Sequence, residues 1–232
     1  MNIPQQTAPD IGNRMHHTFI FQAWLVLLLA SFFGAALASV QLTLAPKIEA
    51  NKLNETREKV PELVLGAAGA QAMATQNRHM KIEQQFIETG TRQKKSYSIF
   101  KAVADGRTKG WVAKTSGQGY ADKIELLVGF DSDAETITGL FVLGQKETPG
   151  LGSKINETAW RGQFIGKAAS QQLKAVKTEP SKPDEIKAIT GATISSKSVC
   201  DIVNQCMGDL RQPLADMASG DSVAGDMQQE NK

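Results

Sequence analysis

The sequence is short of the residues that build metal clusters and disulfide frameworks. It contains two cysteines, Cys200 and Cys206, and three histidines, at positions 16, 17 and 79. Two cysteines are too few for an iron–sulfur cluster or a four-cysteine zinc site, and the histidines are too scattered for a metal cluster. If one helix carries both cysteines, their spacing puts them on different faces and excludes a disulfide between them. We interpret both as buried small apolar residues.

The chain also lacks an excess of charge of one sign. Its 26 Lys and Arg residues face 24 Asp and Glu residues, which gives a formal net charge of +2 and points to no nucleic-acid partner. A chain of 232 residues suits one domain with additional segments.

One long segment lacks charge altogether, because no residue between Thr18 and Pro46 is ionisable. About 20 helical residues cross the hydrocarbon core of a membrane. We therefore predict a single transmembrane helix over residues 19–44, after a short N-terminal segment over residues 1–18. The alternative is a cleaved signal peptide, for which Ala36-Leu37-Ala38 resembles a cleavage site. The apolar stretch exceeds the usual core of about 7–15 residues, which favours an uncleaved anchor.

The part of the chain after this segment changes character twice. Residues 45–95 are predicted to form a helical linker, in which "KIEANKLNETREK" pairs acids with bases at helical spacing until Pro61 interrupts the helix. Four short alternating segments then follow one another with turn-rich stretches between them, which predicts an antiparallel sheet. These segments are "SYSIFKAV", "GWVAKTS", "DKIELLVGFD" and "TITGLFVLG".

Helical patterns close the domain. "TAWRGQFIGKAA" is close to helical spacing, and "SSKSVCDIVNQCMGDL" is clearly amphipathic. The polar tail over residues 211–232 has no periodicity, and we predict that it is disordered. The fold class predicted is α+β: one N-terminal transmembrane helix, then a single domain over residues 96–210 with an antiparallel sheet flanked by helices.

Small residues crowd the start of the amphipathic helix, in Thr190-Gly191-Ala192-Thr193. Helix N-termini present unpaired N–H groups and hold phosphate well, and a glycine lets a ligand approach the backbone. The alternative is that Thr193 or Ser195 simply caps the helix. Two further glycine-rich loops, "GQKETPGLGSKI" over 144–155 and "SGQGYADKI" over 116–124, could form the walls of a pocket with this stretch.

From about Phe19 to Leu210, the order of these features resembles a known family. An N-terminal membrane helix, "GQGYADKIELLVGFD", "ETPGLGSKI" and "TGATISS" follow one another as in the FMN-carrying subunits of bacterial ion-translocating complexes. The resemblance is to RnfG, the G subunit of the Rnf complex. The sibling family is the C subunit of the Na⁺-pumping NADH:quinone oxidoreductase, which the compact length and "QKETPGLGSKI" favour less.

The resemblance implies a site and a function. FMN would be joined covalently to Thr193 through a phosphoester, donated from FAD by a flavin transferase of the ApbE type. Thr190, Gly191 and Ala192 would shape the approach, and the segment with Glu147, Thr148, Leu151 and Gly152 would lie against the flavin. The protein would then relay electrons within a membrane complex, between a ferredoxin couple and NAD, as ions cross the membrane.

One residue departs from the family pattern, and the charges that flank the apolar segment disagree with the orientation that the family implies. Family members often carry an acid where this chain has Lys187, with Asp184 and Glu185 slightly upstream. The basic residues flanking the apolar segment lean weakly towards a cytoplasmic domain. The resemblance implies the opposite, a single-pass protein of the inner membrane with residues 1–18 in the cytoplasm and its FMN domain on the periplasmic side. The alternatives from other classes are an anchored binding module without covalent flavin and a flavoprotein of another extracytoplasmic reductase.

Overall fold

The computed structural model describes residues 11–76, 78–89 and 95–229. The chain divides into two compact units, Met1–Asn51 and Lys52–Lys232. The described part of the first unit is the N-terminal part of helix α1 (Ile11–Thr75), whose large apolar side chains from Phe21 to Leu44 are exposed. By length and composition this helix could cross a membrane, as the sequence predicted. Most of the predicted cytoplasmic segment, residues 1–10, lies outside the described residues.

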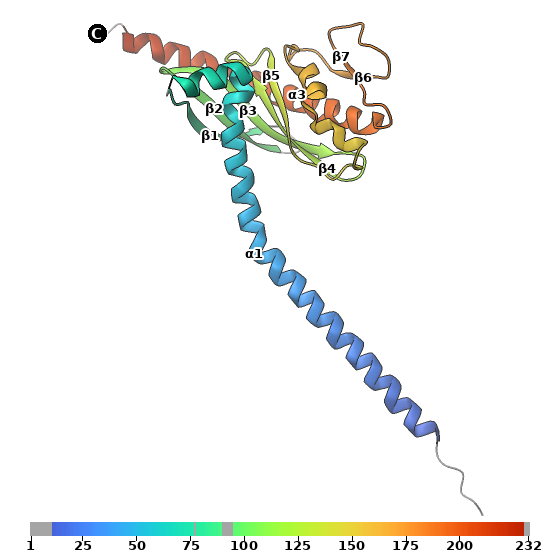
Figure 1. The fold of residues 1–232 in the computed structure, drawn as a ribbon. Coiled ribbons are helices and arrows are strands. Elements are labelled where there is room, and N and C mark those ends of the chain that lie inside the picture. The colour runs from blue at the N-terminus through green and yellow to red at the C-terminus, as the bar shows by residue number, and fades with distance from the viewer. Residues whose placement is uncertain (1–10, 77, 90–94, 230–232) are drawn as a thin grey trace, which may run out of the picture. The chain divides into compact units, whose positions relative to one another are not determined.

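The second unit is built on a five-stranded antiparallel sheet, in which each strand pairs with the one before it in the chain (Figure 1). The strands are β1 (Lys81–Thr89), β2 (Lys95–Ala104), β3 (Arg107–Gln118), β4 (Lys123–Phe130) and β5 (Ile137–Gly144). The predicted α+β class is confirmed, and the four predicted strands correspond to β2–β5. Asp105 and Gly106, both with positive φ, form the tight turn between β2 and β3.

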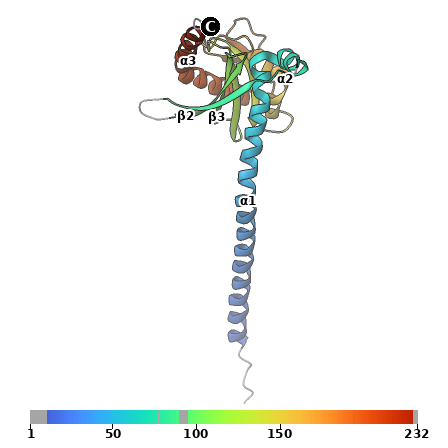
Figure 2. The ribbon, with the colours of Figure 1, turned by 90° about the vertical axis from the view of Figure 1, so that its left-hand side faces the viewer.

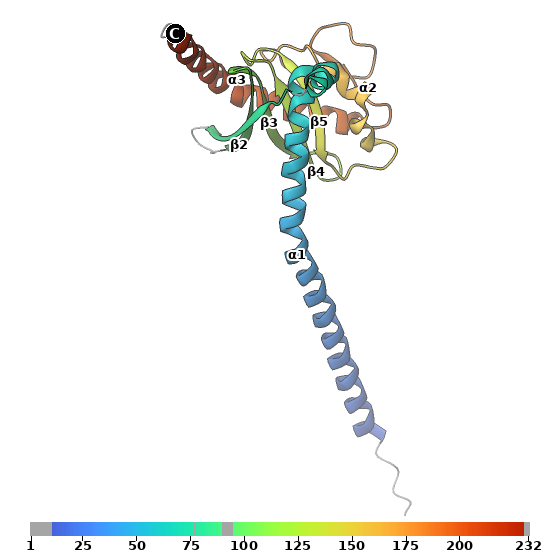
Figure 3. The ribbon, with the colours of Figure 1, turned by 60° about the vertical axis from the view of Figure 1, so that its left-hand side comes forward.

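The part of α1 that follows Lys52 covers one face of this sheet (Figure 3). Three strands place glycines beneath it. A Cβ added to Gly110 would lie 2.8 Å from a Val64 methyl, and one added to Gly129 would lie 2.5 Å from the Leu63 carbonyl oxygen. One added to Gly139 would lie 2.8 Å from the Leu63 side chain. The missing side chains therefore let the helix backbone rest directly on the strands.

The predicted interruption at Pro61 is wrong, because α1 continues through it and breaks at Gly66 instead. Gly66 has φ 72° and ψ 167°, a conformation that is essentially restricted to glycine. The hydroxyl of Thr138 donates to the Leu63 carbonyl at 2.6 Å, next to this break. Packing of this segment on the sheet offsets the loss of the backbone hydrogen bond that Pro61 cannot donate.

Helix α3 (Thr193–Gln229) covers the opposite face, and the main core lies between it and the sheet. Both cysteines lie on this helix, buried and free, as the sequence predicted. The first residues of β2 pair only with the edge strand β1, because the pairing of β2 with β3 starts at Ser98 (Figure 2). There the Tyr97 hydroxyl donates to an Asp209 carboxylate oxygen at 2.6 Å and fastens the hairpin to α3.

Short elements connect β5 to α3. They are the 3₁₀ helix η1 (Gly152–Asn156), α2 (Thr158–Arg161), the 3₁₀ helix η2 (Gly162–Phe164) and the parallel pair β6 (Lys174–Val176) and β7 (Glu185–Lys187). The helix expected over "TAWRGQFIGKAA" is therefore only α2 and η2. Its aromatic pair, Trp160 and Phe164, packs edge to face with ring centroids 5.3 Å apart.

Two predicted boundaries need correction. Residues 45–95 are not a helical linker throughout, because residues 52–75 of α1 pack on the sheet and β1 forms its edge. The tail predicted to be disordered over residues 211–232 is helical up to Gln229, where α3 ends, and residues 230–232 lie outside the described residues. Leu214 is fully buried, and Met217 packs against the same core, so this turn of the helix has an apolar face.

Candidate functional site

The small-residue stretch forms the turn that leads into α3. Gly191 has φ 82°, in the left-handed region that favours glycine, and Thr193 is the first helical residue. The hydroxyl of Ser196 accepts a hydrogen bond from the Ile189 N–H and donates to the Ala192 carbonyl, both at 3.0 Å. Ser196 therefore fastens the turn, a role that the sequence suggested for Thr193 or Ser195.

Thr193 is left available by this arrangement. It is half-buried, and within the described part of the chain its hydroxyl makes no hydrogen bond. The N–H groups of the first helical turn have no carbonyls behind them, and the first turn of α3 contains no acidic residue. A hydroxyl and a set of unpaired donors at the positive end of a long helix can together hold a phosphate group.

A buried carboxylate ties this helix start to the two other glycine-rich loops. Glu147 is only 3 % exposed. One of its oxygens accepts a hydrogen bond from the Ala121 N–H at 3.0 Å, in the loop between β3 and β4. The other accepts from the Ser195 hydroxyl at 2.5 Å, in the first turn of α3. The three loops predicted to form one pocket wall are thus brought together by a single side chain.

Two glycines make room for this carboxylate. A Cβ on Gly119 would lie 2.4 Å from Glu147 Oε1, and a Cβ on Gly152 would lie 2.8 Å from the Glu147 Cβ. The Gly152 position would also bring that Cβ within 3.0 Å of the Ser195 hydroxyl oxygen. The last glycine of "ETPGLG" is therefore explained by the contact of Glu147 with Ser195.

The outer surface of the site carries exposed apolar groups. Leu151 is 45 % exposed, Ile194 57 % and Tyr120 63 %. The Leu151 side chain borders the turn, because one of its methyls would lie 3.1 Å from a Cβ on Gly191. Thr148 is exposed, and its carbonyl accepts hydrogen bonds that hold the loop closed at η1. A flat apolar ring system would find partners among these side chains.

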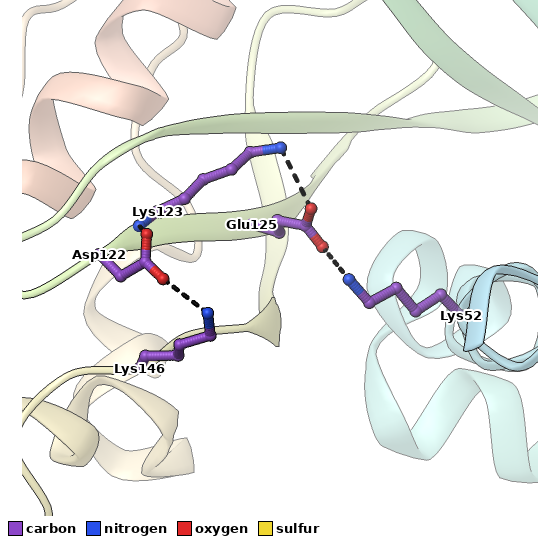
Figure 4. Close-up of polar contacts among 5 residues, drawn as sticks. All are labelled: Lys52, Asp122, Lys123, Glu125 and Lys146. Carbon is purple, nitrogen blue, oxygen red and sulfur yellow. Dashed lines mark hydrogen bonds and ion pairs between the residues drawn. The ribbon is translucent and has the colours of Figure 1, made fainter. Parts of the chain in front are cut away.

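Ion pairs connect the same loops on the outside (Figure 4). Lys146 contacts Asp122 at 2.8 Å and thereby joins the loop before Glu147 to the loop of Ala121. The hydrogen bond from Lys146 holds the pKa of Asp122 below its ordinary value. Close by on β4, Glu125 contacts Lys52 of α1 at 2.6 Å and Lys123 at 3.2 Å.

Lys187 stands at the end of β7, where the family pattern often has an acid. Its side chain pairs with Glu179. Its backbone N–H donates to the Gln163 side chain at 2.7 Å, and its carbonyl accepts from the Trp160 indole at 2.8 Å. The upstream acids are engaged in their own loop, since Glu185 accepts hydrogen bonds from Ser181 and Lys182.

The structure thus gathers the predicted site residues at one end of the sheet. Thr190 and Gly191 are exposed, whereas Ala192, Glu147 and Gly152 are buried. Sequence reasoning missed the partners of Glu147, which are the Ala121 N–H and the Ser195 hydroxyl. No local sequence pattern predicts the contact between Glu147 and Ser195, because the two residues are 48 positions apart.

Comparison with known proteins identifies a family over this part of the chain. Residues 119–208 match the FMN-binding domain family, a range that includes the loop over 144–155, the start of α3, and the third loop from Gly119 onward. The chain is 32% identical over 189 residues to the G subunit of the Na(+)-translocating ferredoxin:NAD(+) oxidoreductase complex of Acetobacterium woodii, covering 80% of this chain and 88% of that protein. It is 36% identical over 105 residues to the G subunit of the ion-translocating oxidoreductase complex of Methanosarcina acetivorans, covering 45% and 53%.

Solved structures show the same fold. The crystal structure of Shewanella oneidensis NqrC superposes with a TM-score of 0.57 at 16% identity, covering 74% of this chain and 99% of that one. The C subunit of the Na(+)-translocating NADH-quinone reductase of Parabacteroides distasonis gives 0.52 at 22% identity, covering 70% and 90%.

The fold and the site define an FMN-binding domain that follows a long apolar N-terminal helix. Within that class, the similarity along most of the chain is to the G subunits. The chain belongs to the RnfG family, the G subunits of ion-translocating oxidoreductase complexes, which is the family that the sequence motifs resemble.

Proposed function

We propose that this protein is the flavin-carrying electron-transfer subunit of a membrane-bound Rnf-type complex, with FMN joined to Thr193 by a phosphoester. The observation that carries the proposal is the position of Thr193. It is the first residue of α3, two positions after Gly191 in its left-handed conformation, and its hydroxyl has no hydrogen-bond partner in the described residues.

The attachment would be a phosphoryl-group transfer. The Thr193 oxygen attacks the phosphorus on the riboflavin side of the FAD pyrophosphate, and the bond from that phosphorus to the bridging oxygen breaks. AMP leaves, and the hydroxyl proton passes to the leaving phosphate or to solvent. The product carries one negative charge on its phosphodiester, which the first-turn N–H groups of α3 would stabilise. A flavin transferase of the ApbE type would catalyse the step.

The surrounding residues fit the rest of the cofactor. Gly191 offers no side chain where the phosphate would enter, the Leu151 side chain borders the same turn, and Thr148 is exposed in the loop that carries Leu151. When bound, FMN supplies one-electron and two-electron redox chemistry, and a covalent tether keeps it from leaving an exposed site. The chain's own residues hold and orient the cofactor, so we assign no general acid or base.

The complex and its location follow from the family. We infer that electrons pass between a ferredoxin couple and NAD through several subunits while ions cross the membrane. The apolar part of α1 would anchor this protein in the inner membrane, with the FMN domain on the periplasmic side. The C subunit of the Na(+)-translocating NADH-quinone reductase is a weaker fit. The Vibrio anguillarum protein of that name is 28% identical over 43% of this chain.

Flavin fluorescence in a denaturing gel tests the attachment, using the full chain co-expressed with a flavin transferase. A fluorescent band is expected for the wild type and for Thr190→Ala, and none for Thr193→Ala. The peptide that contains Thr193 should be heavier by one FMN less water in mass spectrometry. Absence of a band in the wild type would instead favour an anchored binding module. A band that survives Thr193→Ala would move the attachment elsewhere.

Reporters fused to the two ends of the chain test the location. A periplasm-active reporter should be active after the C-terminus and inactive at the N-terminus. The reverse pattern would place the domain in the cytoplasm, as the basic residues flanking the apolar segment suggest.

A further inference from the structure

We propose that Glu147 is a positioning residue for flavin attachment, which acts on Thr193 through Ser195 and touches neither the flavin nor the reacting phosphorus. This rests on the proposed attachment at Thr193. Both oxygens of the carboxylate are already engaged, one by the Ala121 N–H and the other by the Ser195 hydroxyl.

The burial of Glu147 argues for such a role. A carboxylate that is 3 % exposed loses its hydration, and no lysine or arginine among the described residues forms an ion pair with it. Such a group is retained only where hydrogen bonds replace the water. Here each hydrogen bond fixes a different element, so the carboxylate joins the β3–β4 loop to the first turn of α3.

The path from Glu147 to the acceptor is short. Ser195 lies two positions after Thr193 in the same helical turn, so holding the Ser195 side chain also fixes the backbone of Thr193. The glycines at 119 and 152 leave the space that this arrangement occupies. The backbone N–H of Glu147 is held in turn by the Gln145 side chain at 2.5 Å. The backbone of Glu147 is therefore held by Gln145, and its carboxylate is held by Ala121 and Ser195.

Positioning of an acceptor has a recognisable kinetic signature. A displacement of about 1 Å at a reacting group can slow a transfer by about 100-fold, while the binding of the other substrate is unchanged. Glutamine in place of Glu147 can still accept from the Ala121 N–H and can donate to the Ser195 oxygen. A positioning role therefore tolerates Glu147→Gln, whereas a role that requires the charge, such as a general base, does not.

The experiment measures FMN transfer from FAD to the purified full-length chain in detergent by a flavin transferase. Glu147→Ala should transfer about 100-fold more slowly at saturating FAD, with the KM for FAD unchanged, and Glu147→Gln within about threefold of the wild type. Ser195→Ala removes one of the two ties and should slow transfer by about 10-fold. It also serves as the test if Glu147→Ala does not fold.

A matched control separates positioning from general loss of stability. Val112→Ala removes buried volume on the opposite face of the sheet, under α1. Compared at a temperature well below both melting points, it should leave the transfer rate unchanged. Amide hydrogen exchange in the peptide over 188–198 should speed up in Glu147→Ala and not in Val112→Ala.

The outcomes that overturn the proposal are distinct. Transfer at the wild-type rate in both Glu147→Ala and Ser195→Ala would remove the positioning role. Equal, large losses in Glu147→Gln and Glu147→Ala would assign the charge a chemical role instead. A wild-type chain that takes up no flavin would overturn the attachment itself, and this proposal with it.

Discussion

Two regions of the FMN-binding domain use glycine for opposite purposes. Under α1, Gly129 and Gly139 lie against Leu63 of the helix, and Gly110 lies against Val64 and the Phe130 carbonyl oxygen, at distances that leave no room for a Cβ. At the loop end of the sheet, Gly150 has no atom within 4 Å of a would-be Cβ, and Gly191 has only a Leu151 methyl at 3.1 Å. Both of these loop glycines have positive φ. The first region needs glycine for close packing, and the second needs it for backbone conformation and free space.

The largest effect is expected where packing is closest. In Gly129→Ala the new Cβ would lie 2.5 Å from the Leu63 carbonyl oxygen, a backbone atom that cannot rotate away. We expect the free energy of unfolding to fall by about 3 kcal/mol or more, measured by urea denaturation. Gly162→Ala is the control, because that position is exposed and open, and its stability should change by less than about 0.5 kcal/mol. Equal stability of the two variants would contradict the close packing of α1.

The second prediction concerns the end of α3, on the other packed face. Leu214 is fully buried, so Leu214→Ala should lower the free energy of unfolding by about 2–3 kcal/mol. The exposed neighbour Gln212 is the control, and Gln212→Ala should change stability by less than about 0.5 kcal/mol in the same denaturation experiment. No cost in Leu214→Ala would mean that this segment is not packed on the domain.

The third prediction tests whether Gly191 is needed only for its left-handed backbone or also for the space that its missing side chain leaves beside Thr193. Gly191→Ala forces a side chain into the left-handed region, at a cost of about 1–2 kcal/mol. Gly166→Ala should cost the same, since Gly166 has φ 78° and open space around it. Only Gly191→Ala should reduce flavin attachment, measured by in-gel fluorescence against thermal stability. Equal attachment in both variants would remove the need for a bare backbone beside Thr193.

The smallest effect is expected at the ion pair between α1 and β4. Burial raises the pKa of Glu125, but hydrogen bonds from Lys52 and Lys123 outweigh it and hold that pKa below its ordinary value. Ionised Glu125 therefore stabilises the fold above its unfolded pKa of about 4.3, and this contribution disappears as the pH falls through the lower folded value.

Denaturation at several pH values tests this assignment. Lys52→Met should cost less than about 1 kcal/mol at pH 7, and less still as the pH falls through the lowered pKa of Glu125 and its carboxylate becomes protonated. Lys81→Met is the control, because its partner Glu83 lies on the exposed edge strand β1. A pH-independent loss in Lys52→Met would show that packing of the lysine stem matters more than its charge.

The fold was predictable wherever local pattern and packing agree. Strands β2–β5 alternate clearly, and the Asp105–Gly106 turn has its characteristic sequence. β1 was missed because "KIEQQFIET" is largely polar, as suits an edge strand with its Phe86 side chain 70 % exposed. Pro61 and Pro213 both lie within helices, where packing outweighs the local preference of proline.

The candidate site was predictable in its parts and not in its assembly. The three glycine-rich loops could be identified from composition, and the resemblance marked Thr193 within them. The hydrogen bond from Ser195 to Glu147 could not be predicted, because the two residues are 48 positions apart and neither has a distinctive local pattern. The sequence also could not predict that Gly119 and Gly152 leave space for that carboxylate, because a glycine in a sequence does not show which atoms lie next to it.

The order of the strands has a consequence for biosynthesis. Because β1–β5 pair in chain order, the sheet can grow strand by strand, with α1 preceding it in the chain to cover one face. The other face stays open until α3 is made, and Thr193 is the first residue of that helix. If FMN is attached to Thr193 as proposed, its hydroxyl reaches its final setting only after α3 has packed on the sheet, which would make flavin loading a late step in maturation.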